Sequence, residues 1–153
     1  RMAFQKTFFV ICGMLCSAQA NSADRFEELY CLAKNIYFES RNQPTLGQIA
    51  VGQVTMNRVN SPRFPNTVCG VVKQGGEKRN RCQFSWYCDG KLDEPKSEPS
   101  WDESVYLSLL IYSEEATIDV TEGALWYHAT YVSPSWAEHY EKTVRINDHI
   151  FYR

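Results

Sequence analysis

The sequence predicts a single α+β domain that is mainly helical and carries a small antiparallel β element. A chain of 153 residues has the usual size of one domain and can bury one core. Apolar residues recur at three- and four-residue steps as far as residue 116, which indicates helices. The later apolar runs, at residues 124–129 and 144–152, are short and indicate strands.

Residues 1–20 have the pattern of a signal peptide. Lys6 precedes an apolar run over residues 8–16, and an Ala-x-Ala site follows that run. The run is far shorter than the about 20 residues that span a bilayer. We therefore expect export and a mature domain over residues 21–153. A buried N-terminal helix and a lipid anchor at Cys16 are the alternatives.

Two amphipathic helices are expected next. Apolar positions indicate the first over residues 24–39, with Asp24 as the N-cap of a capping box. This helix should stop before Pro44, because proline disfavours helical backbone at the residue before it. The second helix begins at Thr45, which opens another capping box, and runs to Val59. Further along we expect a short helix at residues 67–73, loops at 74–81 and 89–100, a third helix at 101–116, and the two strands.

Composition excludes several classes of protein. With 44% hydrophobic and 22% charged residues, the chain is neither disordered nor fibrous. A net charge of -2 gives no basic patch of the kind that nucleic-acid-binding domains carry. Aromatic residues make up 14% of the chain, which suits an extended binding cleft, although a generous core would explain them equally well.

Four cysteines remain beyond residue 20: Cys31, Cys69, Cys82 and Cys88. An even number in a small exported domain indicates two disulfides, and a four-cysteine zinc site without any C-x-x-C pair is the alternative. Of the three pairings we favour Cys82 with Cys88, six residues apart around an aromatic segment, which leaves Cys31 with Cys69. The signal peptide and the disulfides predict a periplasmic or extracellular location.

Glu39 is the candidate for a catalytic general acid. It stands among aromatic residues at the end of the first expected helix, where desolvation would raise its pKa toward neutrality. A surface glutamate at a helix end is the alternative interpretation. The histidines His128, His139 and His149 lack metal-binding spacing, and the chain has no nucleophile elbow and no phosphate-binding loop. We expect no metal and no cofactor.

Eight short motifs occur in order along the mature chain. They are CLAKNIYFESR at residues 31–41, GQIAV at 47–51, VTMNRV at 54–59, CGVVKQ at 69–74, CQFSW at 82–86, ALWYHA at 124–129, VSPSW at 132–136 and INDHIFY at 146–152. Together they resemble the SleB/CwlJ family of cell wall hydrolases. The resemblance implies a lysozyme-like fold and an enzyme that cleaves peptidoglycan glycan strands, with Glu39 as its essential glutamate. The chain departs from the family at Gln43, where a second acid is frequent, and at Asn147, where glycine is usual.

With one obvious carboxyl group, the resemblance favours a lytic transglycosylase. A glycoside hydrolase normally uses two acids. A transglycosylase uses one glutamate, which protonates the glycosidic oxygen and then deprotonates the C6 hydroxyl of N-acetylmuramic acid to form a 1,6-anhydro ring. The alternatives are a muramidase-type hydrolase that recruits Asp89, Asp119 or Glu122, an N-acetylmuramoyl-L-alanine amidase, and a non-catalytic peptidoglycan-binding module. In each case we expect a monomer whose partner is the glycan strand, with no nucleic acid and no membrane segment in the mature chain.

The glycan cleft should offer aromatic faces and polar groups to the sugars. In an extended segment between two cysteines, Gln83 and Ser85 would project to the same side. A packed β-hairpin is the alternative for this segment, and Trp86 could belong to the core. Tyr127 and His128 alternate along a strand, so one of them can face away, and the family motif favours Tyr127 as the neighbour of Glu39. The expected lining residues are Gln83, Ser85, Trp86, Tyr127 and His128.

Overall fold

The computed structural model describes residues 11–113 and 118–153, with side chains from Ser22 onward. It confirms a mainly helical α+β fold with a small antiparallel sheet. Residues 1–10 of the expected signal peptide and residues 114–116 of the expected third helix lie outside the described residues. The helices are α1 (Ile11–Ser40), α2 (Thr45–Val59), α3 (Val68–Val72) and α4 (Glu98–Tyr112), with 3-10 helices η1 (Ser85–Cys88) and η2 (Ser135–His139). The strands are β1 (Trp126–Ala129), β2 (Lys142–Ile146) and β3 (His149–Tyr152).

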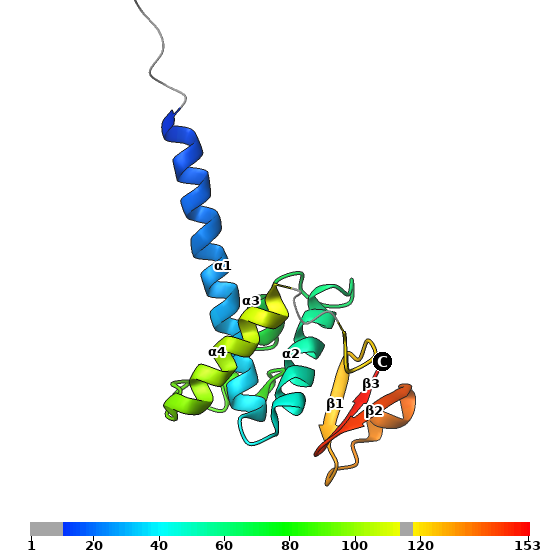
Figure 1. Cartoon of the computed structure of the whole chain (residues 1–153). Helices are drawn as coiled ribbons and strands as arrows, with labels where there is room; N and C mark the ends of the chain where they lie inside the picture. Colours follow the sequence, from blue (N-terminus) through cyan, green and yellow to red (C-terminus); the bar gives the residue numbers. More distant parts are fainter. Residues whose placement is uncertain (1–10, 114–117) are drawn as a thin grey trace, which may run out of the picture.

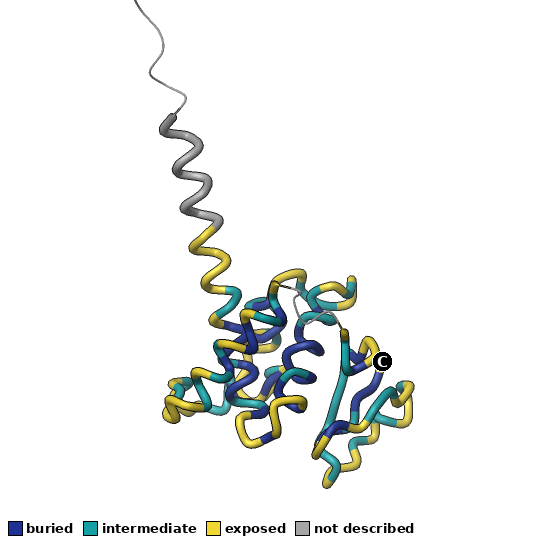
Figure 2. The backbone as a smooth tube through the Cα atoms, viewed as in Figure 1, coloured by how far each residue is buried: buried dark blue, intermediate teal, exposed yellow. Residues whose placement is uncertain are grey.

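The first helix is longer than the sequence predicts. It begins at Ile11, so Asp24 lies inside a continuous helix and is not an N-cap. The residues just before Asp24 include Ala18, Gln19, Ala20 and Ala23, which are good helix formers, and the helix extends through them instead of starting at Asp24. Figure 1 shows α1 projecting from the body of the protein, and Figure 2 shows the helix exposed where its burial is first described and buried toward its C-terminal end. That end positions the candidate site.

The second helix has the predicted bounds but not the predicted cap. Its N-cap is Pro44, and no side chain caps the helix. The Thr45 hydroxyl donates instead to the Glu103 carboxylate on α4 at 2.8 Å, and the Gln48 amide donates to the Gln43 carbonyl at 3.1 Å. Tertiary contacts thus take the side chains that a local capping box would use, and the capping-box interpretation is wrong.

The three strands form an antiparallel sheet in the order β1-β3-β2. The strand and turn expected at residues 144–152 are two strands joined by a tight turn, in which Asn147 has a positive φ of 49°. Asparagine tolerates this left-handed backbone better than most residues, so it fits where the family usually has glycine. In the register, Tyr127 on β1 pairs with Phe151 on β3.

Two apolar clusters hold the helices and the sheet together. In Figure 1, α2 lies between α1 and the sheet, with α3 and α4 packed around α1. The larger cluster joins α1, α3, α4 and η1, and the smaller one joins α2 to the sheet. Tyr127 packs against both clusters, which places it where the helical part meets the sheet. Fully buried side chains at their centres include Leu32, Ile36, Val54, Val71 and Phe151.

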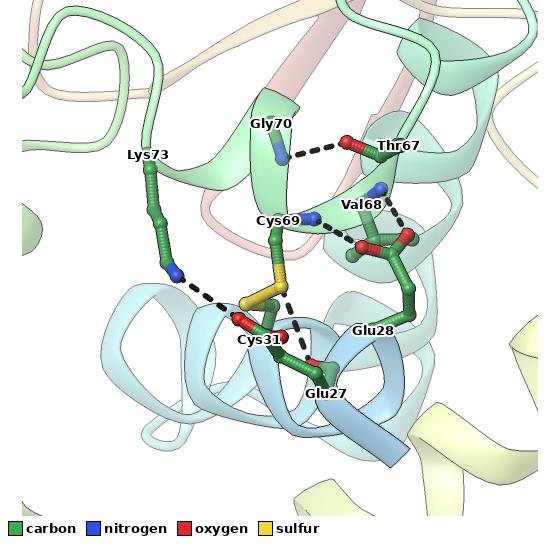
Figure 3. The surroundings of a disulfide bond; sticks show 8 residues. All are labelled: Glu27, Glu28, Cys31, Thr67, Val68, Cys69, Gly70 and Lys73. Carbon is green, nitrogen blue, oxygen red and sulfur yellow. Dashed lines mark hydrogen bonds and ion pairs between the residues drawn. A yellow bond between two sulfur atoms is a disulfide. The ribbon is translucent and has the colours of Figure 1, made fainter. Parts of the chain in front are cut away.

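The structure contains two disulfides, Cys31–Cys69 and Cys82–Cys88, the pairing that the sequence predicts. The first ties α1 to α3 (Figure 3). Beside it, the Glu28 carboxylate accepts hydrogen bonds from the backbone N–H groups of Val68 and Cys69, at 2.5 and 3.1 Å. A carboxylate that accepts from these free N–H groups stabilises the start of α3. A disulfide and two charge-assisted hydrogen bonds therefore hold the same junction between α1 and α3.

Removal of the long disulfide should cost more stability than removal of the short one. The Cys31–Cys69 bridge closes 38 residues, and in the chain-entropy model its loss through the Cys31→Ala/Cys69→Ala pair costs about 4 kcal/mol. The Cys82–Cys88 bridge closes six residues, so the matched Cys82→Ala/Cys88→Ala pair should cost about 2 kcal/mol. Urea unfolding of both double variants measures the difference. An equal loss in the two would contradict the loop-length argument.

Candidate active site

The site forms where the C-terminal end of α1 meets β1. Glu39 is the penultimate residue of α1 and is partly buried. The Tyr127 hydroxyl on β1 donates to its Oε2 at 2.8 Å. Side chains alternate along a strand, so His128 points away from Glu39. The His128 ring stacks on Tyr152 at 5.3 Å and meets Trp136 edge-on at 5.6 Å, within an aromatic group on the other face of the sheet.

Burial sets the protonation of this pair. It raises the pKa of the Glu39 carboxyl above its ordinary value, while the hydrogen bond from Tyr127 and the positive charge of Arg58 act in the opposite direction. Burial also raises the pKa of Tyr127 well above its ordinary value, and the nearby Glu39 carboxylate adds to that rise. Tyr127 is therefore a permanent donor, and Glu39 keeps its proton to a higher pH than an exposed carboxyl does.

Arg58 is a functional candidate that the sequence reasoning missed. Its side chain is buried at 2% exposure, and its guanidinium lies between the rings of Phe64 and Phe84, 5.2 and 5.1 Å from their centroids. Its Nε donates to the Leu125 carbonyl at 2.7 Å, and its buried Nη1 has no partner among the described residues. Its spacing in the sequence could have identified it. Arg58 follows Val54 by four residues, which puts an arginine on the buried face of α2.

Trp86 is held rigidly beside α1. Its Nε1 donates to the Asn35 side chain at 2.9 Å, Asn35 donates to the Thr55 hydroxyl at 3.1 Å, and its ring stacks on Phe38 at 4.8 Å. Trp86 is buried in the larger apolar cluster, as the core interpretation anticipated. One buried chain of hydrogen bonds therefore links the η1 turn to α1 and α2.

The segment around Trp86 is not the extended strand that the sequence predicts. Residues Ser85–Cys88 form the 3-10 helix η1, closed by the Cys82–Cys88 bridge. A six-residue disulfide loop whose tryptophan is fixed to Asn35 must turn, so strand alternation does not apply. Gln83 and Ser85 are exposed, and no side-chain contact joins them to Glu39 among the described residues.

Gln43 occupies the position where the family often has a second acid. Its side chain is 9% exposed and forms a two-way contact with Asp148 in the β2–β3 turn. The Gln43 side-chain N–H donates to the Asp148 carboxylate at 3.3 Å, and the Asp148 backbone N–H donates to the Gln43 side-chain oxygen, Oε1, at 3.4 Å. Gln43 thus fastens the end of α1 to the sheet.

The other acids named from the sequence bond elsewhere. Asp119 accepts hydrogen bonds from Asn57, Thr121 and the backbone of Gly123, at 2.6 to 2.9 Å. Asp89 pairs with Lys91 at 3.6 Å. Across residues 22–113 and 118–153, the groups that shift the pKa of Glu39 are Tyr127 and Arg58, and neither is a carboxylate. Within the same residues, no three His, Cys, Asp or Glu side chains gather as metal ligands would.

Comparison with known proteins identifies the family. The model of the cell wall hydrolase family matches residues 42–152, beginning three residues after Glu39. Two solved structures resemble the fold. The catalytic domain of the Bacillus cereus SleB protein has a TM-score of 0.62 and 29% identity, covering 82% of this chain and 89% of that one. The catalytic domain of the germination-specific lytic transglycosylase SleB from Bacillus anthracis has a TM-score of 0.63 and 30% identity, covering 82% and 93%.

Curated relatives are similar over part of their length. The spore cortex-lytic enzyme of Bacillus subtilis is 31% identical over 132 residues, which cover 81% of this chain but 37% of that protein. The spore cortex-lytic enzyme of Bacillus cereus is 51% identical over 45 residues, covering 29% of this chain and 17% of that protein. The chain thus corresponds to little more than a third of the Bacillus subtilis relative.

Proposed function

This chain belongs to the cell wall hydrolase family, and we propose that it is an enzyme that cleaves the glycan strands of peptidoglycan as a lytic transglycosylase. The observation that carries the proposal is the state of Glu39. It is a partly buried carboxyl with a raised pKa, held by a tyrosine hydroxyl at 2.8 Å, at the end of a rigid helix. The similarity to the SleB catalytic domain of Bacillus cereus and to the lytic transglycosylase of Bacillus anthracis supports the same activity.

In the proposed mechanism Glu39 acts twice. Its raised pKa keeps the carboxyl protonated to a higher pH than an exposed carboxyl, which favours donation of a proton to the glycosidic oxygen as the bond to N-acetylmuramic acid breaks. The resulting carboxylate is stabilised by the Tyr127 hydroxyl and the Arg58 charge. It then removes the proton from the C6 hydroxyl of the same sugar, whose oxygen closes on C1. Glu39 ends protonated, ready for the next bond.

The groups that shift the pKa of Glu39 in the described structure favour this outcome over hydrolysis, because none of them is a carboxylate. Hydrolases that retain or invert configuration place two carboxyl groups about 5 to 10 Å apart across the bond. Among the residues whose side chains are described, the groups that shift the pKa of Glu39 are the Tyr127 phenol and the Arg58 guanidinium. A transglycosylase needs no second carboxylate because the C6 hydroxyl of the sugar is the nucleophile.

We further propose the residues along which the glycan strand lies. Tyr127 lies at the reacting carboxyl, and Trp86 borders the cleft. The exposed Gln83 and Ser85 stay expected sugar contacts, and His128 lies behind the sheet.

We also propose the cellular location of the protein. The sequence pattern of residues 1–20 and the two disulfides support export to the periplasm or the cell exterior, where we expect a monomer. No helix in the described part of the chain is long and apolar enough to cross a membrane.

Mass spectrometry of peptidoglycan digested in heavy-oxygen water tests the proposal. A lytic transglycosylase gives 1,6-anhydro-muropeptides, which lack one water relative to hydrolysis products and carry no heavy oxygen. Reducing ends labelled with heavy oxygen would replace the proposal with a hydrolase. Freed stem peptides would indicate an amidase, and binding without any product would indicate a non-catalytic module.

A further inference from the structure

A pocket of about 670 Å³ lies at the C-terminal end of α1, the end that carries Glu39. It is bounded by that end of α1, by Trp86 and by the segment at residues 89–97. Tyr37 and Phe38 of α1 line it, together with Arg41, which follows the last residue of the helix. The stacked rings of Phe38 and Trp86 form one apolar wall. We call it the 89–97 pocket.

The 89–97 pocket carries charges of both signs, several of them unpaired. Arg41 lies over the Tyr37 ring at 4.9 Å and the Phe38 ring at 6.0 Å, and neither it nor Lys96 has a carboxylate partner in the described structure. On the acidic side, burial raises the pKa of Asp93, Lys34 lowers it, and Asp89 and Glu94 raise it further. Asp89 pairs with Lys91, whereas Asp93 and Glu94 form no ion pair among the described residues. Unpaired cations and unpaired carboxylates in one pocket favour a ligand with both carboxylates and an amine.

A glycan strand without stem peptides offers only part of this chemistry. Each of its N-acetylmuramic acid residues carries one carboxylate, on the lactyl group, but the strand carries no amine. The stem peptide of peptidoglycan does match, because it carries free carboxylates and, where it is not cross-linked, the amine of its diamino acid. The stem is attached through the lactyl group on C3 of muramic acid, the sugar whose C1 bond Glu39 is proposed to break. The stem therefore starts a few bonds from the reacting C1 atom, and the 89–97 pocket lies at the same end of α1 as Glu39.

We propose that the 89–97 pocket binds the stem peptide attached to the muramic acid at the cleaved bond. Arg41 and Lys96 bind its carboxylates, and Asp93 and Glu94 bind its amine. This inference rests on the proposed function, to which it adds recognition of the peptide. The enzyme would then select strands that still carry stems over strands that an amidase has stripped.

The first test compares two soluble substrates, uncross-linked glycan strands with stem peptides and the same strands after amidase treatment. A charge-assisted contact of this kind is worth about a tenfold preference, so wild-type kcat/KM should favour stem-bearing strands by about tenfold. In Arg41→Gln the ratio of the two values should fall to near one. Lys78→Gln removes one charge from the exposed loop outside the pocket and should keep the wild-type ratio. A wild-type ratio near one, or an unchanged ratio in Arg41→Gln, would overturn the proposal.

A binding experiment separates this inference from the proposed function. N-acetylmuramyl-tetrapeptide, which has no glycosidic bond to cleave, should shift the backbone amide NMR signals of residues 89–97. N-acetylmuramic acid alone should not shift them, and Arg41→Gln should weaken the response. If the enzyme cleaves neither kind of strand, the proposed function is wrong. The binding result then decides by itself whether the 89–97 pocket binds the stem peptide. No tetrapeptide-dependent shift at residues 89–97 would sink the pocket itself.

Discussion

The Glu39→Gln enzyme is expected to cleave glycan strands about 10²–10⁴-fold more slowly than the wild type, the usual contribution of positioned acid–base catalysis. Glutamine keeps the shape of the side chain and can still accept the 2.8 Å hydrogen bond from Tyr127. It cannot give or take the proton that the reaction moves. Product formation from purified peptidoglycan, followed by chromatography, measures the loss. A folded variant with near-normal turnover would show that another group is the acid.

The same substitution should not destabilise the protein at neutral pH. Because burial raises the pKa of Glu39 in the folded state, ionising it costs folding free energy. Below the ordinary carboxyl pKa of about 4.3, both states hold the proton and this cost is absent. As the pH rises through the raised pKa, the wild type loses stability that Glu39→Gln retains. Urea unfolding at acidic and neutral pH should therefore show the variant gaining on the wild type as pH rises, which also proves that it is folded.

Arg58→Gln should change both stability and the pH dependence of activity. It removes the donor to the Leu125 carbonyl and the cation between Phe64 and Phe84, at a cost of about 3 kcal/mol in unfolding free energy. It also removes the positive charge that lowers the pKa of Glu39. Because the pKa of Glu39 is then higher, Glu39 stays protonated up to a higher pH. The pH at which kcat/KM falls on the alkaline side should therefore be higher than in the wild type.

Two further variants separate these effects. Arg58→Lys keeps the positive charge but not the planar group between the rings, so it should lose stability while holding the wild-type pH profile more closely than Arg58→Gln. Arg63→Gln is the matched control, because Arg63 also lies over a ring, that of Trp126 at 4.6 Å, yet has no effect on Glu39. If Arg58→Gln and Arg63→Gln have the same pH profile, Arg58 is a packing residue alone.

Local patterns carried most of the prediction of the fold. The apolar periodicity gave α2 its bounds, Thr45 to Val59, and indicated α3 and α4. The short spacing of Cys82 and Cys88 pointed to a local bridge, which left Cys31 for Cys69. At Thr45 a distant contact replaced a local signal, because Thr45 bonds Glu103 on α4 instead of capping its own helix. At Asp24 the local prediction was wrong for a local reason, since the helix continues back to Ile11.

The sequence by itself determined the candidate acid, because Glu39 stands in a motif among aromatic residues at a helix end, and all of that is local. Only the tertiary structure decided what surrounds Glu39. Tyr127 reaches it across 88 residues, Arg58 is held by Leu125 across 67, and Gln43 meets Asp148 across 105. Periodicity and capping express interactions within a few residues of chain. The pKa of a carboxyl depends instead on burial and on charges within a few ångströms, which packing alone brings together.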